Sequence, residues 1–81
     1  MRKIIFLFLV TIQVFSQSNF DLGKQYFTEK KWELSKTNFE KALIQNPNNH
    51  SAIEYLGDIF GHQKEWDLAI EKYKTLRNQF P

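Results

Sequence analysis

The sequence contains no cysteine, only two prolines and only three glycines. Without cysteine the chain can form neither a disulfide nor a Cys-ligated zinc site. The glycines do not form a phosphate-binding loop, and neither a G-x-S-x-G nor an H-E-x-x-H motif is present. With 81 residues and no covalent cross-link, stability must come from one small hydrophobic core. These absences predict a protein that is not an enzyme and needs no cofactor.

The chain also lacks a strong charge of either sign. It has 11 Lys and Arg against 9 Asp and Glu, and two of the basic residues, Arg2 and Lys3, lie in a segment that we expect to be removed. The remainder balances, because 11 − 2 leaves 9 basic residues against 9 acidic ones. A balanced charge gives no long-range attraction to nucleic acid or to anionic lipid, so neither is expected as a partner.

Residues 1–16 differ in kind from the rest of the chain. The basic pair Arg2-Lys3 precedes an apolar run from Ile4 to Phe15, which ends at Ser16. A basic head, a short apolar segment and a small exit residue are typical of a secretory signal peptide. As a helix the run would span about 18 Å, less than the ~30 Å of a bilayer core. We therefore expect cleavage, export to the periplasm or cell envelope, and no stable membrane span afterwards; an uncleaved tether and a buried helix are the alternatives.

The remaining residues divide into two units, 17–47 and 48–81, related by an offset of 34. Seven pairs are identical at this offset: Leu22/Leu56, Gly23/Gly57, Lys30/Lys64, Trp32/Trp66, Leu34/Leu68, Gln45/Gln79 and Pro47/Pro81. Apolar residues recur at helical spacing in each unit and predict helices over residues 18–28, 32–45, 51–61 and 66–79. Ser18 is a candidate cap for the first helix, and Pro47 disfavours helix before it. A period between 20 and 50 residues indicates a stacked-repeat architecture.

The two units resemble tetratricopeptide repeats, whose 34-residue signature is W-x₂-L-G-x₂-Y followed by A, F, A and P. The matching residues are Leu22, Gly23, Tyr26, Ser35, Phe39, Ala42 and Pro47 in the first unit, and Leu56, Gly57, Phe60, Ala69, Tyr73 and Pro81 in the second. The departures are Asn19 and Ile53 at the tryptophan position, and Ser35 and Leu76 at alanine positions. The resemblance implies an all-α fold, a short α-solenoid of two helix-turn-helix units with four helices. It also implies a non-catalytic scaffold for protein–protein interaction.

The glycines support this arrangement independently of the family. Gly23 and Gly57 stand in the middle of predicted helices, where each costs up to about 1 kcal/mol relative to alanine. Their recurrence predicts that a second helix approaches closely, with the small residues Ser35 and Ala69 opposite. We interpret these residues as core.

Within the resemblance, a partner peptide or helix binds a concave face lined by the first helix of each unit. The positions concerned are Phe20, Lys24, Phe27, Tyr55, Asp58 and His62. Phe27 and Tyr55 could anchor a peptide, since large rings often do; packing between neighbouring helices is the alternative. Asp58 and His62, four residues apart, are expected as a polar pair at a helix end rather than as half of a metal site. Trp32 and Trp66 are expected to pack across the turns.

Two repeats are fewer than the three or so that stacked repeats usually need. We therefore expect either the leading part of a longer repeat protein or a chain that a partner or a second copy completes. Three functions follow: binding of a protein or peptide partner, self-assembly, or a segment of a larger protein whose other domains carry the activity.

Overall fold

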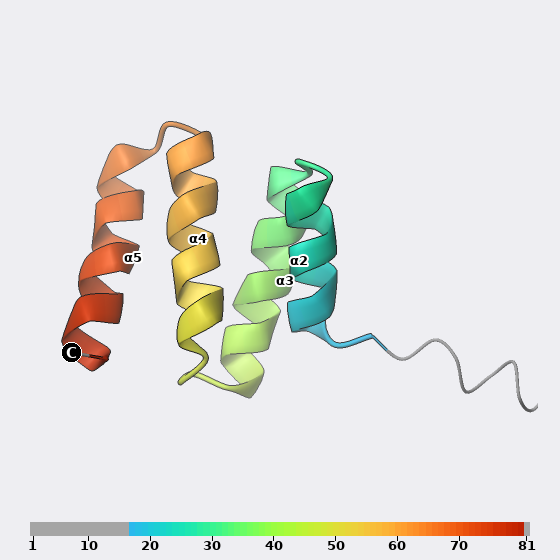
Figure 1. Cartoon of the computed structure of the whole chain (residues 1–81), viewed down its shortest axis with the longest axis horizontal. Coiled ribbons are helices and arrows are strands. Elements are labelled where there is room, and N and C mark those ends of the chain that lie inside the picture. Colours follow the sequence, from blue (N-terminus) through green and yellow to red (C-terminus); the bar gives the residue numbers. More distant parts are fainter. Residues whose placement is uncertain (1–16, 81) are drawn as a thin grey trace, which may run out of the picture.

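The computed structural model describes residues 17–80, which are entirely helical apart from turns and ends (Figure 1). The helices are α2 (Asn19–Thr28), α3 (Trp32–Gln45), α4 (His50–His62) and α5 (Trp66–Gln79). The predicted all-α fold is confirmed, and each predicted helix boundary lies within one residue of the observed one. The predicted signal peptide, residues 1–16, lies outside the described residues.

Local hydrogen bonds explain where the first helix of each unit begins. The Ser18 hydroxyl accepts a hydrogen bond from the Asp21 backbone N–H at 3.0 Å. Asn49 does the same for α4 through its side-chain oxygen, 3.1 Å from the Ala52 nitrogen. Both side chains satisfy backbone donors that a helix start leaves unpaired.

The turns inside the two units have the same geometry. Lys30 and Lys64, 34 residues apart, both adopt left-handed backbone conformations, with φ of 61° and 63°. The next backbone N–H, that of Lys31 or Glu65, donates to a carbonyl five residues earlier, at 2.9 and 2.8 Å respectively. This pattern is the Schellman ending of a helix, in which glycine is the preferred left-handed residue.

The helices form two antiparallel pairs, α2 with α3 and α4 with α5, and α3 packs against α4 to join them (Figure 1). This arrangement confirms the predicted short solenoid of two stacked units.

The glycines allow the helices of each pair to approach closely. A Cβ atom at Gly23 would lie 2.8 Å from ring atoms of Phe39, and one at Gly57 would lie 2.8 Å from the ring of Tyr73. Ser35, fully buried, adds a bond in the first pair, because its hydroxyl donates to the Gly23 carbonyl at 2.7 Å. The predicted close approach at both glycines is therefore confirmed.

The core lies mainly between the two units. Its fully buried cluster combines Phe39 of α3 with Ala52, Leu56 and Ile59 of α4. In α5 only Ala69 is buried. Helix α4 therefore supplies most of the core, and α5 packs against α4 with one face only.

Candidate functional site

Aromatic side chains from α2, α3 and α4 form a continuous strip where the two units meet. We call this strip the aromatic row; its members are Phe20, Tyr55, Phe27, His62 and Trp32. Tyr55 lies edge-on to both phenylalanines, with ring centroids 6.2 Å from Phe20 and 5.1 Å from Phe27. Phe27 is 5.8 Å from the His62 ring, which stacks on Trp32 at 4.4 Å with an interplanar angle of 7°. Edge-on and stacked contacts of this kind fix the relative orientation of the rings.

The aromatic row brings together four of the residues that the sequence singled out: Phe20, Phe27, Tyr55 and His62. The rings of Phe20, Phe27 and Tyr55 are half-buried and pack against the core. Tyr55 also stacks on Phe39, with the ring centroids 4.7 Å apart. Phe27 and Tyr55 therefore pack between helices, which was the alternative to a purely exposed anchor. Because neither is fully buried, each still presents part of its ring to the surface.

Lys24 lies at one edge of the aromatic row. Its ammonium group is 4.9 Å from the centroid of the Phe20 ring, within the range of a cation–π contact. It is also 3.9 Å from the Asp21 carboxylate, and both side chains are exposed. An exposed ion pair at this distance contributes little to stability, so the ammonium group remains accessible to a second anion.

Asp58 faces α5 instead of the aromatic row. Its carboxylate accepts a hydrogen bond from the Tyr73 hydroxyl. Partial burial and the bond to the Asp58 carboxylate together raise the pKa of Tyr73 to about 12. Asp58 and His62 thus have different partners, and no hydrogen bond or ion pair joins them among the contacts of residues 17–80.

Trp32 is the member of the aromatic row that the sequence did not assign to the site. Its packing across the turn is confirmed, since its ring lies 5.2 Å from Phe27. It additionally covers His62 of the next unit. The sequence could have indicated this contact. Trp32 begins α3 and His62 ends α4, and a short turn between two helices brings the start of the first close to the end of the second.

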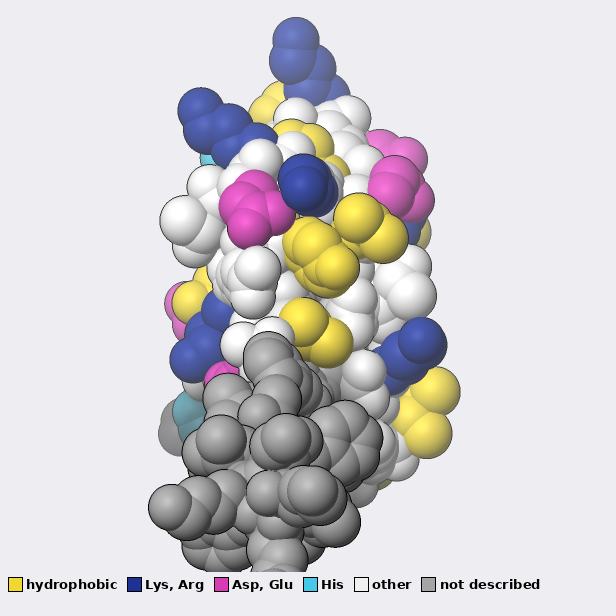
Figure 2. Space-filling view, turned by 90° about the vertical axis from the view of Figure 1, so that its right-hand side faces the viewer, with side chains coloured by type: hydrophobic (Ala, Val, Ile, Leu, Met, Phe, Trp, Pro, Cys, Tyr) yellow, Lys and Arg dark blue, Asp and Glu magenta, His cyan; other side chains and the backbone are white. Residues whose placement is uncertain are grey.

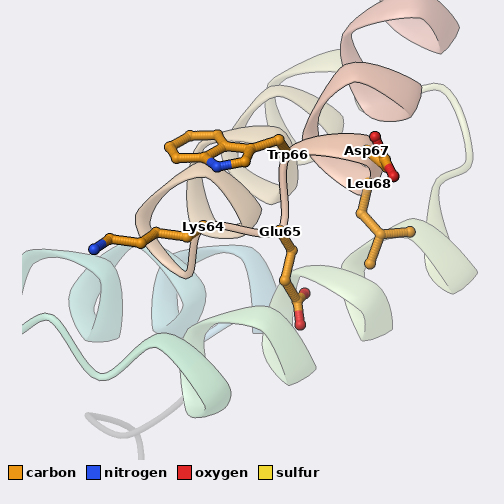
Figure 3. Close-up of a pocket in the computed structure, with 5 residues that line it drawn as sticks. All are labelled: Lys64, Glu65, Trp66, Asp67 and Leu68. Carbon is orange, nitrogen blue, oxygen red and sulfur yellow. The ribbon is translucent and has the colours of Figure 1, made fainter.

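Trp66, the counterpart of Trp32, stacks on no other ring within residues 17–80 and is 60% exposed. A hollow at the α4–α5 turn is lined by Lys64, Glu65, Trp66, Asp67 and Leu68 (Figure 3). The indole and the Lys64 side chain extend to the same side of the turn, away from Asp67 (Figure 3). No residue of the aromatic row lines this hollow.

Within residues 17–80, no three His, Cys, Asp or Glu side chains are close enough together to bind a metal ion. Among the helices described, none has the length and apolarity needed to cross a bilayer.

Comparison of the chain with family models, with curated proteins and with solved structures gave no match.

Proposed function

We propose that the chain is a tetratricopeptide-repeat protein that binds a partner peptide or helix along the aromatic row and has no catalytic activity. The observation that carries this proposal is the convergence of Phe20, Phe27, Tyr55 and His62, from two helices of different units, on one partly exposed strip. The repeat signature and the glycine-dependent helix pairing support the family.

The strip favours a partner with a particular chemistry. Half-buried rings offer an apolar surface, and aliphatic or aromatic side chains can pack against their edges and faces. Lys24 adds a positive charge at the border of that surface. The best match is therefore a segment with apolar side chains in a row and a carboxylate placed to reach Lys24.

A photo-crosslinking experiment tests this proposal in cells that make the protein. A photoreactive phenylalanine analogue replaces His62, the exposed ring of the aromatic row, in one variant and Lys41, an exposed residue of α3, in the control. We expect a cross-linked species of defined mass at position 62 and none at position 41. Adding Tyr55→Ala to the first variant should abolish it; equal cross-linking at both positions would contradict the proposal.

Self-assembly is the second candidate function, because α5 leaves large apolar side chains exposed. Cross-linking distinguishes the two candidates by mass. A cross-linked product of twice the chain mass, formed at position 62, would indicate a second copy and not a different partner.

We also propose that the protein is exported and acts in the periplasm or cell envelope, on the strength of the pattern in residues 1–16. Mass spectrometry of the protein from cells tests this directly. The expected mature form begins at or close to Gln17, and a form that retains Met1 would count against export by cleavage.

A further inference from the structure

Helix α5 carries an exposed face that nothing in residues 17–80 covers. The face, which we call the α5 face, consists of Trp66, Ile70, Tyr73 and Arg77. Their spacing of 4, 3 and 4 places them on one side of a helix. The three apolar members are 60%, 51% and 42% exposed, respectively. A row of large exposed apolar side chains is a feature of interaction surfaces.

The equivalent face of α3, 34 residues earlier, is covered by α4. It consists of Trp32, Lys36, Phe39 and Leu43, of which Phe39 is buried and the other three are half-buried. His62 stacks on Trp32 at 4.4 Å and Tyr55 stacks on Phe39 at 4.7 Å. The structure thus contains one complete example of how such a face is covered.

Helix α4 covers α3 with a defined set of side chains. Ala52 and Ile59 are fully buried, and Tyr55 and His62 supply the two stacked rings. The order of a small residue, a ring, a branched aliphatic residue and a ring at spacing 3, 4 and 3 defines one face of the helix. The helix runs antiparallel to α3, because the end of α4 meets the start of α3.

Helix α2, together with its N-cap residue, carries a different set at the same four positions. They are Ser18, Asp21, Gln25 and Thr28, all exposed and all polar. In the view from the side of α2, charged and polar side chains lie above and to both sides of a short central group of hydrophobic ones, on the part of the face that grey atoms do not cover (Figure 2). Stacking α2 of a second copy on the α5 face would bury these polar groups against apolar rings, which is unfavourable. The repeat therefore has one polar end and one apolar end, and head-to-tail stacking of identical chains is disfavoured.

We propose that the α5 face binds an amphipathic helix with the chemistry of α4, contributed by a partner and running antiparallel to α5. That helix presents a small residue, an aromatic ring, a branched aliphatic residue and a second ring at spacing 3, 4 and 3. Across the covered interface Gln63 donates to the Glu33 carboxylate at 2.6 Å. Asp67 takes the place of Glu33 on α5, so the partner helix carries a hydrogen-bond donor just after its second ring. Arg77 replaces Leu43, so the other end of the partner helix carries a carboxylate.

Two tandem variants of the full chain test this surface without an unknown ligand. In the first, a copy of residues 48–81 follows Pro81, which supplies an α4-type helix at high effective concentration. In the second, the appended copy carries Ser, Asp, Gln and Thr in place of Ala52, Tyr55, Ile59 and His62, as in α2. Hydroxyl-radical footprinting with mass spectrometry measures the oxidation rate of Trp66 in each.

We expect the oxidation rate of Trp66 to fall at least twofold in the first tandem variant and to stay at the level of the original chain in the second. Ile70→Glu in the original part of the first variant should restore the rate. Ile70 is exposed before docking, and the new carboxylate would lie where Lys36 pairs with Glu33 on α3, but beside the like-charged Asp67. Equal protection in both variants, or none in either, would overturn the proposal.

Sedimentation of the original chain with and without Ile70→Glu tests the competing occupant. A monomer, with Trp66 fully oxidised, agrees with a partner helix as the occupant. A dimer that protects Trp66 and that Ile70→Glu dissolves would overturn the proposal, since the α5 face would then belong to a second copy.

Discussion

The two glycine contacts have the same geometry but different surroundings, and alanine substitution at each should give different results. Alanine is better than glycine in a helix interior by about 1 kcal/mol. At Gly23 and Gly57 the new Cβ would meet a ring at 2.8 Å, a distance that requires the ring to move. Where the ring cannot move, adding a methyl group to a well-packed core typically costs about 1–3 kcal/mol of stability. The net result depends on whether the ring has room.

At Gly23 the ring has no room. Phe39 is fully buried, with Phe20 on one side at 5.6 Å and Tyr55 stacked at 4.7 Å. Because the ring is enclosed, the overpacking cost should lie in the upper part of that range, at about 2–3 kcal/mol. After the gain of about 1 kcal/mol in helix propensity, we expect Gly23→Ala to lower the free energy of unfolding by about 1–2 kcal/mol. In a domain of this size that corresponds to a fall in Tm of roughly 4–15 °C.

At Gly57 the ring is Tyr73, which is 42% exposed and can shift slightly toward solvent. The cost should then nearly cancel the helix gain, leaving stability within about 0.5 kcal/mol of the original. Gly61 is the control, because a Cβ there would lie 3.9 Å from the nearest atom, an ordinary contact with Trp66. Gly61→Ala should raise stability by up to about 1 kcal/mol.

Thermal and urea unfolding of the three variants, followed by circular dichroism, measure this order. The expected ranking is Gly61→Ala above the original chain, Gly57→Ala close to it, and Gly23→Ala well below it. A Gly23→Ala variant as stable as Gly57→Ala would refute the reasoning, since it would mean that burial of Phe39 does not restrain its ring.

Three further predictions concern single contacts. Ser35→Ala removes the buried bond to the Gly23 carbonyl, and should lower stability by about 0.5–1 kcal/mol in urea unfolding once the better helix propensity of alanine is subtracted. Lys30 has a left-handed backbone with φ of 61°, which glycine adopts at no steric cost, so Lys30→Gly should raise the free energy of unfolding by about 0.5–1 kcal/mol and raise Tm. Lys41→Gly, in the regular part of α3, should lower Tm instead. The pKa of Tyr73 is raised to about 12, so Tyr73 contributes stability that is complete below the ordinary tyrosine pKa of about 10 and is lost as the pH rises to 12. Because the ring is partly exposed, we expect this contribution to be only about 1 kcal/mol. It should appear as a step in the pH dependence of the free energy of unfolding, and Tyr73→Phe should remove that step.

The helices and their pairing were predictable because they depend on local chemistry repeated twice. Glycine, a small residue and a ring recur 34 positions apart, and each recurrence marks one contact between paired helices. The turns were placed correctly, although their left-handed lysines were not foreseen. Lysine does not favour that conformation, and the hydrogen bonds of the helix end impose it.

The site was only partly predictable, because most of its contacts join residues that belong to different units. Periodicity shows which residues face away from the paired helix, but it does not say which side chain of the next unit they meet. The stacking of His62 on Trp32 is of this kind, whereas the bond from Tyr73 to Asp58 lies within the second unit. His62 lies in the aromatic row as expected, but Asp58, which we expect on the same surface, bonds to Tyr73 of α5.

The same side chains hold the two units together and form the proposed binding strip. Tyr55 stacks on the buried Phe39 with one part of its surface and meets Phe20 and Phe27 at the rim of the aromatic row. Removing its ring therefore weakens the joint between units and any partner contact at once. Lys24 is exposed and makes only an ion pair and a cation–π contact, so its charge reversal leaves the joint intact. A loss of binding by Lys24→Glu with an unchanged Tm would therefore separate recognition by the strip from the stability of the repeat, which Tyr55→Ala alone does not.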